Sequence, residues 1–115
     1  MRGVEERIGA VVVRRVLHDI DRDAAPELEA WALEKLEMGE RFLVLHCGKA
    51  QCFDSVGLEL VLALTRAASS QGARFVLAHL NADCSTTLRV TRLERAIEHY
   101  LTVEDAILAV QGRRA

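Results

Sequence analysis

The chain has 115 residues, of which half are apolar and 28% are charged, with seven glycines and one proline. This length suffices for one compact domain and not for two, and the composition excludes disordered and collagen-like chains. The formal net charge of −2 provides no general attraction to nucleic acid or to an anionic membrane. No apolar run approaches the roughly 20 residues that cross a bilayer, and the charged N-terminus is not followed by a signal-type apolar block. We therefore expect a cytoplasmic protein with a single domain over residues 1–115, without direct membrane insertion and without a nucleic-acid partner.

The cysteines are Cys47, Cys52 and Cys84. An odd number of cysteines without a secretory signal does not indicate a disulfide framework. A zinc site would draw on these thiols together with His46 and His79, but their spacing lacks the repeated close-spaced ligand pair of structural zinc sites. We therefore expect buried thiols in preference to metal ligands, and no cofactor.

Hydrophobic patterning divides the chain into short β-type runs and longer helical segments. A β-branched run follows Gly9 and is too short for a core helix, so it predicts a strand. The first helix is expected to begin with Asp23 as its N-cap, to carry Pro26 in its first turn and to end at Gly39. The expected elements, in chain order, are strands over 4–8 and 10–17, a helix over 23–39, a strand over 42–46, a helix over 55–70, a strand over 74–79, a helix over 82–91, a short strand over 99–101 and a helix over 102–110.

This alternation of strands and helices predicts an α/β fold with a mainly parallel sheet and right-handed crossovers. Parallel strands send their carboxyl ends to one edge, where ligands usually bind in open α/β sheets. The segments Asp19–Asp23, Asp54–Ser55 and Asn81–Asp83 follow such strands. We expect these three segments to converge at that edge.

Three segments resemble motifs of one known family. Residues 17–28 read LHDIDRDAAPEL, which is similar to the turn G-x-L-D-x-x-x-A-P-x-L. Residues 43–58 read LVLHCGKAQCFDSVGL, which resembles L-V-L-D-L-S-x-V-x-F-I-D-S-[ST]-G-L. The last third adds GARFVL from Gly72, leucines at 88 and 93, and a closing Glu-Asp-Ala helix. These motifs, in this order and spacing, are those of STAS domains, which are named for sulfate transporters and anti-sigma factor antagonists, and the resemblance covers essentially the whole chain.

The resemblance implies an α/β fold consisting of a single STAS-like domain. Its sheet would be mainly parallel, with about five strands, right-handed β-α crossovers and about four helices mostly on one face. The other face would be unusually open.

The resemblance also implies a regulatory role. In anti-sigma factor antagonists, the serine of Asp-Ser-[Ser/Thr]-Gly is phosphorylated by the partner anti-sigma factor, which is itself an ATP-dependent serine kinase. The unphosphorylated form binds the partner, and the phosphorylated form releases it. Carried onto this chain, the phosphorylation site is Ser55. The residues flanking the site or contacting the partner are Asp21, Asp54, Val56, Gly57, Leu58 and Glu59.

Ser55 also attracts interest without the resemblance, because it begins a predicted helix directly after Asp54. Backbone N–H groups and the helix dipole stabilise a phosphate at such a position. A phosphate would add about −1.5 to −2 charge and repel an apolar or acidic partner surface. The alternative is that Ser55 or Asp54 only caps the helix. The two roles are compatible.

The acidic loop holding Asp19, Asp21 and Asp23 admits two interpretations. It is either a solvated loop with Asp23 as a cap, or it orients a kinase or holds a magnesium ion. Asp21 is the stronger functional candidate, because it occupies the acidic position of the family motif. A phosphatase with an aspartate nucleophile, or a Cys52 nucleophile paired with His18 or His79, has no supporting sequence context. We therefore expect no enzymatic activity.

Three positions depart from the family motif, and two of them support a different function. His18 replaces the glycine before the acidic turn. Val56 replaces a second hydroxyl residue, and His46 replaces an aspartate in the strand. The alternative is a constitutive STAS subunit of a signalling assembly or of a membrane transporter complex, without a phosphorylation switch.

Overall fold

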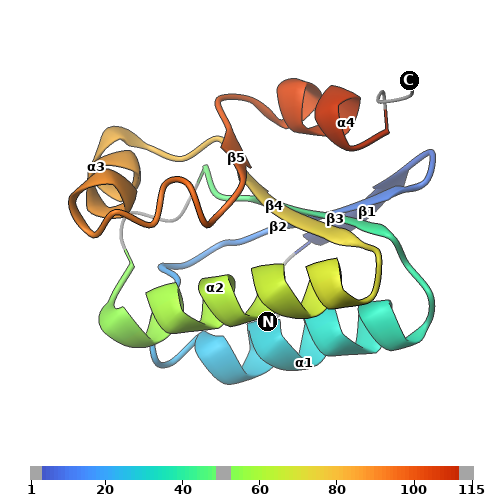
Figure 1. Ribbon diagram of the computed structural model, residues 1–115, viewed down its shortest axis with the longest axis horizontal. Coiled ribbons are helices and arrows are strands. Elements are labelled where there is room, and N and C mark those ends of the chain that lie inside the picture. Colours follow the sequence, from blue (N-terminus) through green and yellow to red (C-terminus); the bar gives the residue numbers. More distant parts are fainter. Residues whose placement is uncertain (1–3, 49–52, 112–115) are drawn as a thin grey trace.

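The computed structural model describes residues 4–48 and 53–111, and its centre is a five-stranded sheet (Figure 1). The strand order follows the sequence, with β1 antiparallel to β2 and all later neighbours parallel, which confirms the expected α/β fold. The strands are β1 (Val4–Ile8), β2 (Val11–Arg15), β3 (Phe42–His46), β4 (Arg74–Ala78) and β5 (His99–Tyr100).

The helices cover the two faces of the sheet unequally (Figure 1). The helices are α1 (Ala25–Glu37), α2 (Ser55–Ser70), α3 (Ala82–Val90) and α4 (Val103–Gln111). Helices α1 and α2 lie side by side across one face, and α3 lies beyond the carboxyl ends of the parallel strands. Only α4, among the described helices, packs on the opposite face, so part of that face is left uncovered.

The sequence of β3, FLVLH, does not alternate between apolar and polar residues, because both faces of this strand are buried. Leu43 and Leu45 are buried in the larger core under α1 and α2. Val44 is buried in the smaller core under α4. A strand that is buried on both faces needs apolar residues at successive positions, so its run carries no period of two.

The start of α1 differs from the sequence prediction. Its N-cap residue is Ala24, which makes no capping side-chain bond, and Asp23 is exposed. The carboxylate that accepts backbone bonds here is Asp21, whose Oδ1 accepts from the N–H groups of Asp23 (3.1 Å) and Ala24 (3.0 Å). The prediction of Asp23 as the cap was therefore wrong, because an Asp-type turn two residues earlier already satisfies these donors.

Two described cysteines are buried, as the sequence analysis expected. Cys47 and Cys84 have no exposed surface, and Cys52 lies outside the described residues. Burial raises the pKa of the Cys47 thiol to about 12, so this thiol stays protonated at neutral pH. Among the described residues, no helix is long and apolar enough to span a bilayer.

Trp31 joins α1 to the first two strands. Its side chain is 9% exposed, and the guanidinium carbon of the buried Arg14 lies 5.3 Å from its ring centroid. The indole N–H donates to Glu5 Oε1 at 2.9 Å, while Lys35 pairs with Glu5 Oε2 at 2.9 Å. These two bonds, the indole bond first, lower the pKa of Glu5.

Replacing Trp31→Ala is expected to lower the free energy of unfolding by about 3–5 kcal/mol, because it removes a buried aromatic side chain and the cation–π contact of Arg14. Leu33→Ala, on the exposed face of the same helix, serves as the control and should cost about 0.5 kcal/mol. Urea denaturation measures both values. Equal losses for the two variants would contradict the role given to Trp31.

Candidate functional site

Ser55 is the first residue of α2 and its side chain is exposed to solvent. The preceding residue, Asp54, has extended backbone angles and is the N-cap of the helix. The hydroxyl of Ser55 is therefore accessible at the positive end of a helix of 16 residues. An enzyme that transfers a phosphoryl group can reach it without unfolding the chain.

The carboxylate of Asp54 joins the start of α2 to the loop before α1. Its Oδ1 accepts from the Gly57 N–H at 2.8 Å, and its Oδ2 accepts from the Arg22 N–H at 2.9 Å. These bonds, the one from Gly57 first, hold the pKa of Asp54 below its usual value. Asp54 is thus the capping residue at this position.

Gly57 lets the helix approach that loop closely. A Cβ at this position would lie 1.9 Å from the carbonyl oxygen of Ile20 and 2.7 Å from its carbonyl carbon. Ile20 in turn forms an isolated parallel bridge with Phe53, and its carbonyl accepts from the Asp54 N–H at 3.4 Å. Glycine is therefore required here by the proximity of the two backbones.

The expected convergence of loops at the carboxyl edge is confirmed for two of the three segments. The bonds of Asp54 bring residues 19–23 against residues 54–55. The third segment supplies the cap of α3, where the Asn81 side chain accepts from the Cys84 N–H at 2.8 Å. No described bond joins Asn81–Asp83 to Ser55.

The remaining predicted residues divide into packing and exposed groups. Val56 and Leu58 are half-buried and pack against the larger core. Glu59 is exposed one turn after Ser55. Asp21 is half-buried and its carboxylate is engaged in the turn before α1, so it lies near Asp54 as a structural residue of the loop.

Among the described residues, the groups considered for a phosphatase or a metal site are not brought together. A phosphatase with an aspartate nucleophile also needs a lysine, and Lys35 is instead paired with Glu5 of β1. Within the described part of the chain, no group of His, Cys, Asp and Glu side chains is arranged to hold a metal ion. Cys52 and Lys49, the other lysine considered for a phosphatase, lie outside that part.

Sequence reasoning missed two backbone groups that shape this site, the N–H of Arg22 and the carbonyl of Ile20. Nearly every residue has a backbone N–H and a carbonyl, so the sequence does not mark the ones that take part in a site. The only signal in the sequence was a capping residue, Asp54, followed closely by Gly57. It also did not bring together Arg15, His46 and His79, which end neighbouring strands on the less covered face.

The sequence model of the STAS domain matches residues 4–106. The chain belongs to the STAS domain family. A curated STAS relative from Thermotoga neapolitana, named as a candidate anti-sigma factor antagonist, is 26% identical over 104 residues, covering 90% of this chain and 92% of the relative.

Solved structures share the STAS fold along nearly the whole chain. The crystal structure of a candidate anti-sigma factor antagonist from Thermotoga maritima has a TM-score of 0.87 and 22% identity, with 95% of this chain and 94% of that chain covered. The structure of the anti-sigma factor antagonist SpoIIAA in its unphosphorylated form has a TM-score of 0.79 and 21% identity, with 98% of this chain and 99% of that chain covered. The crystal structure of a sulfate transporter family protein from Wolinella succinogenes has a TM-score of 0.80 and 12% identity, with 92% of this chain and 88% of that chain covered. These likenesses show the fold, which antagonists and transporter proteins share.

Gly57→Ala is expected to reverse the usual effect of this substitution in a helix. Glycine to alanine normally stabilises a helix by about 1 kcal/mol, but here the new methyl group would collide with the Ile20 carbonyl. We expect the free energy of unfolding to fall by more than about 1 kcal/mol, measured by urea denaturation. Ala63→Gly, at an exposed position of α2, supplies the ordinary cost of glycine in the same helix. A stabilised Gly57→Ala variant would disprove the close approach.

Asp54→Asn is expected to lower the free energy of unfolding at neutral pH, and this loss should become smaller at acidic pH. The pKa of Asp54 is lowered by folding, so its charge contributes stability above the unfolded value near 3.8, and that contribution is lost as pH falls through the folded value. Unfolding midpoints of both proteins at pH 7, 5 and below 4 measure this convergence. A difference that is independent of pH would show that the charge of Asp54 has no role.

Proposed function

We propose that this protein is a regulatory binding module that docks a protein partner at the edge around Ser55 and is released when Ser55 is phosphorylated. The partner we propose is an anti-sigma factor with serine kinase activity. The observation that carries the proposal is an exposed serine at the first position of α2, held in place by the bonds of Asp54. The antagonist relatives described above support the same role.

Docking and phosphorylation would use one surface. Ser55 and Glu59 are exposed on α2, and Val56 and Leu58 leave part of their apolar surface accessible beside them. A kinase that binds this surface places its active site near the hydroxyl. The phosphate that the kinase adds to Ser55 would then lie inside the interface between the kinase and this chain.

The phosphate would change the charge of this edge strongly. Asp54 and Glu59 already contribute carboxylates next to Ser55. A phosphoserine adds about −1.5 to −2 charge and removes the only neutral polar group between them. Like-charge repulsion and desolvation of the phosphate would oppose any apolar or acidic partner surface.

The second candidate is a constitutive subunit that binds its partner regardless of Ser55. One specific observation favours it. Val56, at the position of a second hydroxyl in the family motif, packs against the larger core. A sulfate transporter family protein also shares the fold.

The proposal is tested with three bait proteins and ATP in lysate of the source cells. Wild type should acquire phosphate on Ser55, mapped by mass spectrometry, and Ser55→Ala should not. Ser55→Asp should lose at least about tenfold in affinity for the partner that Ser55→Ala retains, because the added charge lies in the interface.

Ser69→Asp is the matched control, since Ser69 is an exposed serine at the other end of α2. It should bind the partner like wild type. Label on another residue, or equal partner affinity of Ser55→Ala and Ser55→Asp, would contradict the proposal. Equal affinity of these two variants in a stable complex would support the alternative of a constitutive subunit.

A further inference from the structure

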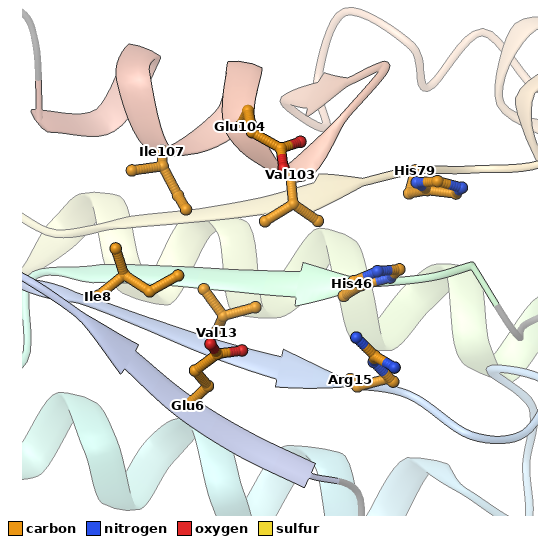
Figure 2. A pocket seen from close by; sticks show the side chains of 9 residues that line it. All are labelled: Glu6, Ile8, Val13, Arg15, His46, His79, Val103, Glu104 and Ile107. Atoms are coloured by element: carbon orange, nitrogen blue, oxygen red, sulfur yellow. The ribbon is translucent and has the colours of Figure 1, made fainter.

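A cavity of about 500 Å³ lies on the less covered face of the sheet, between β1, the ends of β2 and β3, and α4 (Figure 2). It exists because α4 packs over the β3–β5 side of this face and leaves β1 beside it exposed. Its size falls within the range of about 300–1,000 Å³ that is usual for small-molecule sites. The residues lining it are Glu6, Ile8, Val13, Arg15, His46, His79, Val103, Glu104 and Ile107.

One end of this cavity is apolar. Ile8 on β1 and Ile107 on α4 face each other there, with Val13 and Val103 next to them (Figure 2). Ile8 is 37% exposed, although its partner on β2, Val11, has no exposed surface. The pairing of Ile8 with Val11 and of Glu6 with Val13 explains why these β1 side chains share a face with the β2 residues.

The middle and the other end of the cavity carry charged side chains. Arg15 extends from the end of β2, while Glu6 and Glu104 direct their carboxylates into the space between the apolar end and Arg15 (Figure 2). Within the described residues, none of these three side chains forms a salt bridge. One guanidinium and two carboxylates therefore face the same cavity, and none of them is in an ion pair with another described residue.

The two histidine rings form a wall beside Arg15. The rings of His46 and His79 are stacked with centroids 5.1 Å apart. His46 Nδ1 accepts a hydrogen bond from the Gly48 N–H at 3.2 Å, which places the ring proton on Nε2. Burial first, and then the charge of Arg15, lowers the pKa of His46. Arg15 is the one arginine or lysine among the lining residues.

We propose that this cavity binds a small aliphatic α-amino acid of the leucine class. Its carboxylate would pair with Arg15, its ammonium would lie between Glu6 and Glu104, and its side chain would cover Ile8 and Ile107. A fatty acid would bring a third carboxylate and no ammonium to pair with Glu6 and Glu104, and an aliphatic amine would leave Arg15 unpaired. A zwitterion with an apolar side chain complements all three features of the cavity.

Isothermal titration of the full chain with L-leucine tests the proposal. Three analogues each remove one feature: 4-methylpentanoate lacks the ammonium, leucinamide lacks the carboxylate, and glycine lacks the side chain. L-leucine should bind at least about tenfold more tightly than each analogue, because each loses one charge-assisted or apolar contact. No heat with leucine at millimolar concentration, or equal affinity for 4-methylpentanoate, would overturn the proposal.

Variants assign the binding to this cavity. Arg15→Gln and Glu104→Gln, both at exposed positions, should each weaken leucine binding at least about tenfold while leaving the circular dichroism spectrum unchanged. Arg66→Gln, an exposed arginine of α2, is the matched control and should bind like wild type. Unchanged affinity in both cavity variants would overturn the proposal. Ser55→Ala should bind leucine normally, which separates this site from the proposed switch.

Discussion

The site at the sheet edge depends on the close contact between the backbone of α2 and the loop before α1. Gly57 allows this contact because any side chain would meet the Ile20 carbonyl, and Asp54 fixes it by accepting bonds from both segments. Two loops that are more than 30 residues apart in sequence are thereby joined through one carboxylate. Ser55 is the first residue of the helix that is held in this way, and it is exposed.

Sequence patterning predicted the elements well where a single signal dominated. The apolar run at β3 and the capped segment at α2 have the bounds 42–46 and 55–70 that the sequence indicated. The start of α1 was harder to predict, because Asp21 and Asp23 are the same residue type two positions apart, and only Asp21 accepts the backbone bonds that were expected of Asp23. Tertiary packing decides which of the two carboxylates faces the helix. Asp54 is part of that packing, because it accepts a hydrogen bond from the N–H of Arg22, which lies between Asp21 and Asp23.

The less covered face shows a different limit of sequence reasoning. The period of a strand already places Val11, Val13 and Arg15 on one face of β2. The pattern does not reveal which part of that face α4 will cover, because this depends on how a short β5 positions the last helix. The stacking of His46 on His79 depends equally on the left-handed backbone of His79, with φ of 62°, which nothing in its sequence neighbourhood marks.

A phosphate on Ser55 would meet a helix start whose geometry is already determined. Asp54 occupies the Gly57 N–H, so the phosphate cannot take this donor without breaking the bonds that join the two loops. The glycine contact also leaves α2 no space to shift toward Ile20. The proposed switch therefore works through charge at the surface and not through refolding. A rigid site of this kind favours a partner that detects the phosphate directly, because no rearrangement carries the signal elsewhere.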